Sequence, residues 1–252
     1  MYLFFDTETT GVDIGTTGAD PSRIVQIGWA LTDENGNELR SQCFVVRPDS
    51  FEIPEESIRI HGITTELAIS TGVEISAALD AFDEDVLGAR ILVAHNIHFD
   101  KGIISNEYSK IGRSPTFAEK DLYCTMRSST DFCKIRDGKR KRYKWPSLDE
   151  LHISLFGVTF ESQHNALTDA RACARCYFEL RRKGVIFVTQ PLKLEMPEID
   201  EDQLSDDEVL FDDIYEKEEF FRGSEELWVG RIWAHFQKYR SITASPDTAA
   251  RA

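Results

Sequence analysis

The first eight residues place two carboxylates at the end of an apolar strand. Tyr2 to Phe5 form an apolar run that stops at Asp6, and Glu8 follows two residues later. Side chains two residues apart point to the same face of a strand, so these carboxylates would repel each other and lose hydration together. A divalent cation with a preference for oxygen ligands, such as Mg²⁺ or Mn²⁺, is the usual compensation. For this stretch alone, the alternative is a solvated turn after an edge strand.

Two further stretches place acids in comparable positions. At 91–100, ILVAHNIHFD, a short apolar strand ends and Asp100 lies near the start of a helix. At 164–171, HNALTDAR, His164 lies five residues before Asp169, which falls in a long predicted helix. The four acids each follow a strand or lie in a helix beside one. Such a set suits a two-ion phosphoryl-transfer site, in which two cations clamp the attacking and leaving oxygens of a phosphodiester.

The stretches FDTETTG, HNIHFD and HNALTDARA together resemble the three motifs of the DEDDh 3′–5′ exonucleases, in the same order, over residues 1 to about 183. The resemblance implies an RNase H-like fold and two bound divalent cations, Mg²⁺ or Mn²⁺. It implies that Asp6, Glu8, Asp100 and Asp169 are the metal ligands, and that His164 is the general base that deprotonates the attacking water. An imidazole suits this role because it can accept a proton near neutral pH. The alternative for His164 is a helix-capping or solvent-facing residue.

The order of the expected elements predicts an α/β fold with a mixed central sheet flanked by helices. Apolar runs and turn residues predict an antiparallel meander of three strands followed by a fourth strand. The expected strands are 2–6, 23–32, 38–46 and 91–94. Helical spacing of apolar residues predicts helices at 75–88, from about 98, at 121–131, 148–156 and 166–183.

Several residues near the three motifs are candidates for substrate binding. The resemblance implies that the segment after Glu8 contacts the 3′-terminal nucleotide, that the HGIT element at 61–64 lies beside its base, and that Asn96 lies near the scissile nucleotide. Phe99 is expected to pack near the site, and His95 to support the same turn. The candidates are Thr9, Thr10, Gly11, His61, Ile63, Asn96 and Phe99.

A basic run at 134–144 carries the cations Lys139, Arg140, Lys141 and Arg142, with Tyr143 and Trp145 interleaved or adjacent. Cations neutralise phosphates and aromatic rings stack on unpaired bases, so this run is a candidate contact for a nucleic-acid strand. The alternative is a solvated loop with a basic tip.

The net charge of −15 does not exclude a nucleic-acid substrate, because the acid is concentrated late in the chain. Residues 195–226 hold 15 acidic and 2 basic residues, which accounts for −13 of the total. We therefore expect three parts: an exonuclease domain at 1–190, an acidic linker at 191–223, and an amphipathic helix and tail at 224–252. The acidic segment could be a plain tail, a tether to a protein partner, or a restraint on the basic run. The helix could also mediate a homodimer or dock on the chain's own core.

The remaining composition points to a reducing, cytoplasmic setting without a membrane. Five scattered cysteines do not suggest a disulfide framework, and Cys173 and Cys176 read as small buried thiols within a helix. No apolar run approaches the roughly 18 residues needed to cross a membrane. The expected function is 3′–5′ exonuclease activity on single-stranded DNA or RNA. Two alternatives stay open: a non-catalytic binding module of the same fold, and an oligoribonuclease for short RNA.

Overall fold

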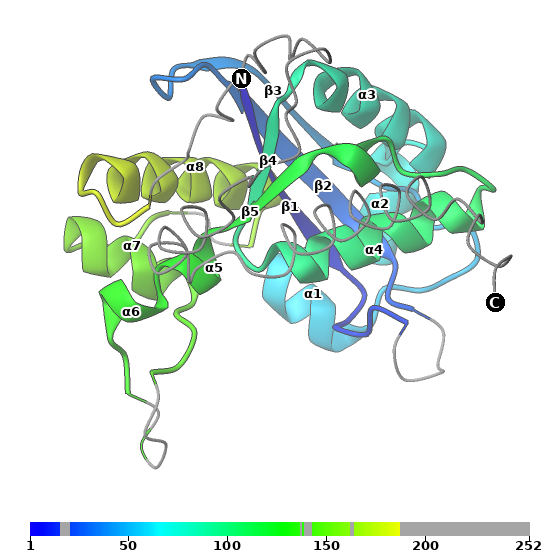
Figure 1. Cartoon of the computed structure of the whole chain (residues 1–252). Coiled ribbons are helices and arrows are strands. Elements are labelled where there is room, and N and C mark those ends of the chain that lie inside the picture. Colours follow the sequence, from blue (N-terminus) through cyan, green and yellow to red (C-terminus); the bar gives the residue numbers. More distant parts are fainter. Residues whose placement is uncertain (16–20, 137, 139–142, 162–163, 187–252) are drawn as a thin grey trace, which may run out of the picture. The chain divides into compact units, whose positions relative to one another are not determined.

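A computed structural model describes residues 1–15, 21–136, 138, 143–161 and 164–186. The expected acidic linker and C-terminal helix, at 191–252, lie outside these residues. The described chain forms a five-stranded mixed sheet in the order β3-β2-β1-β4-β5 (Figure 1). Strands β1, β2 and β3 form an antiparallel meander, and β4 and β5 run parallel to β1. The strands are β1 (Tyr2–Thr9), β2 (Ile24–Thr32), β3 (Glu38–Val45), β4 (Ile91–Ala94) and β5 (Asp121–Cys124).

Eight α-helices and one 3₁₀ turn lie within the described residues. The predicted helices at 75–88 and 148–156 are present with those bounds. The helix at 148–156 begins with a capping box, in which Ser147 and Glu150 each bond the other's backbone nitrogen. The elements are α1 (Glu55–His61), α2 (Thr65–Thr71), α3 (Ile75–Gly88), α4 (Ile97–Lys110), η1 (Thr116–Glu119), α5 (Thr125–Ser128), α6 (Thr130–Cys133), α7 (Leu148–Phe156) and α8 (Ala166–Arg182).

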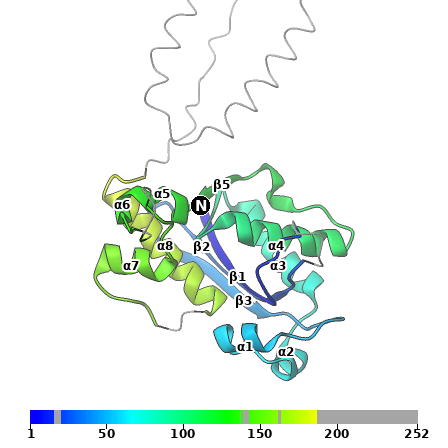
Figure 2. The same ribbon diagram turned by 90° about the horizontal axis from the view of Figure 1, so that it is seen from below.

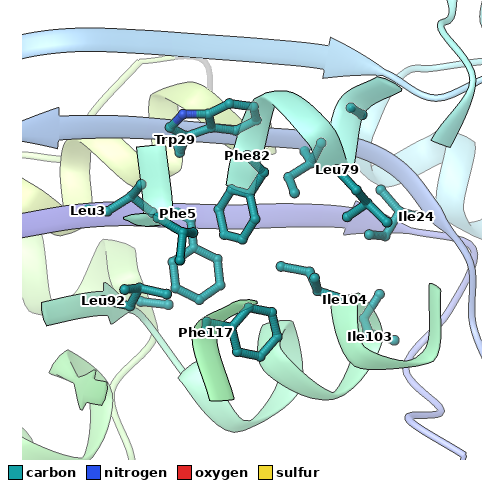
Figure 3. Close-up of a cluster of buried hydrophobic side chains, with 14 of the residues drawn as sticks. Leu3, Phe5, Ile24, Trp29, Leu79, Phe82, Leu92, Ile103, Ile104 and Phe117 are labelled. Atoms are coloured by element: carbon teal, nitrogen blue, oxygen red, sulfur yellow. The ribbon is translucent and has the colours of Figure 1, made fainter. Parts of the chain in front are cut away.

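Alternation along β1 separates two buried cores, one on each face of the sheet. Leu3 and Phe5 pack with residues of α3 and α4, in the cluster shown in Figure 3. Tyr2 and Phe4 pack on the opposite face with residues of α7 and α8. Figure 2 shows the sheet between these two groups of helices. Both faces of the central strand are thus buried, and the mixed sheet flanked by helices is confirmed.

One secondary-structure prediction was wrong. Residues 121–131 were expected to be helical, but 121–124 form the edge strand β5, which pairs residue by residue with β4. Two short helices, α5 and α6, follow it. A strand of four residues is too short to establish a period of two, so its type is set by pairing with β4 rather than by its own pattern.

Two smaller findings concern membrane and cysteine predictions. None of the helices in the described part of the chain combines the length and apolar character that a membrane crossing requires. Cys173 and Cys176 are buried thiols, as predicted, within the core between the sheet and α8.

Candidate active site

Strand β1 continues past its predicted end and carries the two carboxylates within its regular alternation. Asp6 and Glu8 continue the face of Tyr2 and Phe4, which packs against α8. Thr7 between them points to the face of α4. The two faces of this end of the strand therefore meet two different helices, α8 and α4, and each of those helices supplies one further acid.

A close approach between β2 and α8 brings the last acid to β1. Gly28 pairs with Asp6 in the β1–β2 ladder, and a Cβ on Gly28 would lie 2.3 Å from the backbone nitrogen of Leu167 in α8. Nearby on β2, Gln26 Oε1 accepts a hydrogen bond of 2.9 Å from the backbone nitrogen of Ala166. This nitrogen is one of the helix-start donors that have no intrahelical partner. Strand β2 thus fixes the first turn of α8 beside β1.

The sequence analysis did not identify these two supporting residues. The signal available was a glycine and a glutamine in an otherwise apolar strand, paired with Asp6 and Glu8 and on the same face of the sheet as these carboxylates. A glycine inside a strand often marks a close backbone approach, but only the ladder register shows what approaches it and which acids lie beside it.

Asp100 reaches the site from the first turn of α4. Strand β4 ends at Ala94, and its pairing with β1 runs only as far as Phe4 with Val93. Beyond that point Thr7 is free to bond a side chain. Its backbone nitrogen and its Oγ1 both donate to Asp100 Oδ1, at 3.1 and 2.9 Å, and Asp100 is only 2% exposed. A buried carboxylate is thereby held in one orientation by a neighbouring strand.

His164 and Asp169 are joined at the start of α8. The backbone nitrogen of His164 donates to Asp169 Oδ2 at 3.1 Å, and His164 has a left-handed backbone with φ of 63°. The helix cap is Asn165, whose side chain accepts from the backbone nitrogen of Thr168. His164 is therefore not the cap, and its imidazole is exposed. Left-handed backbone is uncommon for a residue with a Cβ and is often found at functional positions.

The four carboxylates are crowded in a largely buried space. Burial raises the pKa of Glu8 to about 8, with a further contribution from Asp169 and Asp100. Burial also raises the pKa of Asp100 to about 7 and that of Asp169 to about 6. The pKa of Asp6 is raised well above its usual value, first by burial and then by the other three acids. Without a compensating positive charge, full ionisation of this cluster is therefore disfavoured.

The donor set fits a divalent cation. One ligand atom each from Glu8, His164 and Asp169 lie within 4.8 Å of one another. Asp169 Oδ1 is buried and has no hydrogen-bond partner among the residues that the structure describes. A buried carboxylate oxygen without a partner is costly unless a cation or proton occupies it. Carboxylate oxygens are the donors that Mg²⁺ and Mn²⁺ prefer, and the imidazole lies alongside them.

The predicted substrate residues at the end of β1 and just after it are held by hydrogen bonds within the protein. Thr9 Oγ1 donates to the carbonyl of Gly11 at 2.5 Å, and Thr10 Oγ1 accepts from the backbone nitrogen of Arg23 at 2.9 Å. A Cβ on Gly11 would lie 3.0 Å from Ser22 Oγ, so this glycine serves a close approach within the protein. All three predicted residues are partly exposed.

The two predicted residues of the HGIT element have different surroundings. His61 ends α1, and its Nδ1 accepts from the backbone nitrogen of Ile63 at 3.1 Å. Burial lowers the pKa of His61, the backbone of Thr9 acts in the opposite direction, and His164 lowers it further. These interactions place His61 beside the site. Ile63 is 7% exposed and packs in a small core with Val25.

The turn before α4 is held by a partly buried histidine. Asn96 has a left-handed backbone with φ of 70°, and Phe99 is partly buried against the main core. His95 Nε2 lies 3.0 Å from the carbonyl oxygen of Pro146, and its Nδ1 lies 3.0 Å from Thr125 Oγ1. A carbonyl only accepts, so Nε2 carries the proton and Nδ1 accepts from the hydroxyl. Burial lowers the pKa of His95 to about 4, which keeps the ring neutral.

A buried ion network behind the site was also missed. Arg23 Nε donates to Glu107 Oε1 at 2.8 Å, and Glu107 is only 1% exposed. The same guanidinium bonds Asp49 at 3.0 Å and lies over the ring of Phe51. This network ties the end of the loop after β1 to α4. Arg23 and Glu107 are 84 residues apart in the sequence, so no local sequence pattern predicts that they pair.

The basic run is described only in part. Its predicted contacts Lys139, Arg140, Lys141 and Arg142 lie outside the described residues, so their role stays a prediction. The flanking residues form a hairpin, in which Arg136 pairs with Tyr143 and the backbone nitrogen of Lys144 donates to the carbonyl of Ile135 at 2.9 Å. In Figure 1 the described flanks of this segment extend away from the sheet, below α6.

Comparison with known proteins gives one family match over most of the chain. A family described as Exonuclease matches residues 3–177. The epsilon subunit of DNA polymerase III from Treponema pallidum is 29% identical over 176 residues, which is 70% of this chain and 74% of that protein. A Mycobacterium tuberculosis protein, whose name joins an exonuclease to an endonuclease, is 33% identical over 175 residues. That match covers 68% of this chain but only 25% of the mycobacterial protein.

Solved structures show the same fold. Escherichia coli exonuclease I in complex with a dT13 oligonucleotide superimposes with a TM-score of 0.58 at 18% identity. The match covers 71% of this chain and 40% of that one. The chain thus spans well under half of exonuclease I, and this likeness establishes the fold of the matched region.

Proposed function

Because this chain belongs to the exonuclease family, we propose that it removes nucleoside 5′-monophosphates one at a time from the 3′ end of single-stranded DNA. The epsilon relative belongs to a DNA polymerase, and one exonuclease I structure is a complex with single-stranded DNA, which supports DNA as the substrate. Residues 1–190 would form the catalytic domain.

The observation that carries the proposal is the convergence of four acids and one histidine from three separate parts of the chain. Asp6 and Glu8 come from β1, Asp100 from α4, and His164 with Asp169 from the start of α8. Their crowding leaves raised carboxyl pKa values and an unsatisfied oxygen on Asp169. If this site had only a structural role, replacing some of its buried acids would make the protein more stable. The presence of all four therefore favours a functional role.

Two Mg²⁺ or Mn²⁺ ions, held by Asp6, Glu8, Asp100 and Asp169, would stabilise negative charge that develops on the scissile phosphate. Thr7 orients the Asp100 carboxylate, and the His164 backbone orients that of Asp169. These hydrogen bonds hold the acids in place before substrate arrives.

His164 would accept the proton of the attacking water. Its imidazole is exposed, so it can reach a water molecule, while its backbone is fixed to Asp169. The carboxylates are poor candidates for this step because their lone pairs would be engaged with cations. Proton transfer to a positioned imidazole contributes about 10²–10⁴-fold in rate.

The decisive experiment compares degradation of a 5′-labelled single-stranded oligonucleotide by the wild-type chain and by Asp169→Asn, with Mn²⁺ or with EDTA. We expect stepwise shortening from the 3′ end only for the wild-type chain with Mn²⁺. Asp33→Asn, at an exposed turn remote from the sheet's active-site end, is the matched control and should retain activity. Retained hydrolysis in a pure Asp169→Asn preparation would falsify the ligand assignment.

The same assay separates the alternative functions. A chain that binds DNA but leaves it intact under all metal conditions would be a binding module. Preference for RNA of a few nucleotides over longer DNA of matched sequence would identify an oligoribonuclease. A chain shortened after residue 190 tests the proposed domain limits, since it should degrade the same substrate.

A further inference from the structure

An exposed tryptophan follows the basic hairpin directly. Trp145 is 59% exposed, although large aromatic side chains are usually buried. The guanidinium carbon of Arg127 lies 5.6 Å from the centre of its ring. Arg127 is itself exposed and makes no ion pair with any acid in the described part of the chain. A cation and an aromatic face are therefore presented together to solvent.

This pair is held in place by the surrounding backbone. Trp145 precedes Pro146, which restricts its backbone to extended conformations. Pro146 is buried, and its carbonyl accepts from His95. On the other side of Trp145, Lys144 Nζ forms an ion pair of 2.5 Å with Glu150 in α7. The backbone that carries the ring is thus anchored on both sides before any ligand binds, which lowers the entropic cost of binding.

The anchor also connects the pair to the active site. His95 is the first residue after β4. Asn96 follows it and precedes α4, which carries Asp100. The same imidazole accepts from Thr125, at the start of the helix that carries Arg127. Both members of the aromatic–cation pair are therefore attached to the turn that positions an active-site acid.

We propose that Trp145 and Arg127 form a stacking site for an unpaired base of the substrate strand, upstream of the terminal nucleotide. This proposal rests on the proposed function. The ring would stack on the base, and the guanidinium would neutralise an adjacent phosphate. Every base has an aromatic face, so the site would recognise a single strand without reading its sequence. Paired bases are not available for such stacking, which would bias the enzyme against duplex ends.

The test combines a protein change with a substrate change. Binding of a 5′-fluorescein dT12 strand is measured by anisotropy with the full chain and Ca²⁺, and a single abasic site is moved stepwise from the 3′ end. We expect Trp145→Ala to weaken binding of the intact strand by about 5- to 150-fold. One abasic position should weaken wild-type binding by a similar factor and leave Trp145→Ala binding unchanged.

Three variants complete the design. Trp145→Phe should retain most of the affinity because it keeps a ring. Arg127→Ala should make the slope of log affinity against log salt concentration less negative by about 0.7, the contribution of one phosphate on a single strand. Val158→Ala, which is 60% exposed after α7, is the control and should bind as the wild type does.

The possible failures are distinguishable. If the wild type binds and degrades the strand but Trp145→Ala has the same abasic profile, the stacking site is refuted and the exonuclease assignment stands. A wild-type chain that neither binds nor degrades any single strand refutes both proposals.

Discussion

Replacing Glu8 with glutamine should make the metal-free protein more stable above about pH 6. Burial and two neighbouring acids raise the pKa of Glu8 from 4.5 to about 8, and its side chain is nearly inaccessible. The folded state therefore holds a proton that the unfolded state releases. Stability from this group is fully present below pH 4.5 and is lost as the pH rises through about 8. Glutamine is neutral throughout and avoids this loss.

The magnitude follows from the same shift. At about pH 7.5 the Glu8 carboxyl lowers the free energy of unfolding by on the order of 4 kcal/mol, relative to a group with an unshifted pKa. Glu8→Gln should recover a large part of this, and its advantage should shrink towards zero near pH 4.5. Saturating Mg²⁺ should offset a large part of this difference, since a ligand at about 100 times its Kd adds about 2.7 kcal/mol to the protein that binds it.

Urea unfolding in EDTA at about pH 5, 6.5 and 7.5 measures this effect, with the two proteins compared at each pH. Glu52→Gln, at an exposed residue, is the control and should show no pH-dependent difference from wild type. If Glu8→Gln is no more stable than wild type at about pH 7.5, or gains equally at about pH 5, the carboxylates are not crowded as the structure places them.

Three further predictions address the support of the site and its metal. Gly28→Ala should destabilise the fold by about 1–3 kcal/mol or more, because its Cβ would clash with the backbone of Leu167; thermal unfolding measures this, and an unchanged Tm would contradict the close approach. Glu107→Leu should cost about 3–5 kcal/mol in urea unfolding because it leaves Arg23 buried without its main partner, and a loss below about 1 kcal/mol would show that Asp49 alone suffices. The Mg²⁺ concentration for half-maximal activity should rise as the pH falls from about 8.5 to 6.5, since protons compete for Glu8; a constant requirement would argue against direct ligation.

Much of the fold could be predicted from the sequence because its local signals agree with the final packing. The antiparallel meander has clear apolar strands and a polar turn, in which Asp33 accepts from the backbone nitrogens of Asn35 and Asn37. The helix at 75–88 carries apolar residues at helical spacing, and this spacing predicts the helix that the structure contains. Where local preference and tertiary structure coincide, a single sequence is sufficient.

The features that the sequence did not predict depend on strand pairing and on contacts between residues far apart in the chain. Strand β5 depends on β4 for its hydrogen bonds, and its four residues carry no period of their own. Gln26 and Gly28 matter because of which β1 residues lie opposite them, and that register is a property of the sheet. The acids of the site were predictable because each lies in a recognisable motif, while the residues that hold those motifs together are dispersed.

The hairpin that carries the basic run meets the rest of the protein at a narrow neck. Ile135 and Lys144 are joined there by a backbone hydrogen bond of 2.9 Å, so the chain leaves and returns at almost one point. A segment with this geometry can be lengthened, shortened or exchanged with little disturbance to the sheet. The length of this segment and the geometry of the sheet can thus change independently of each other.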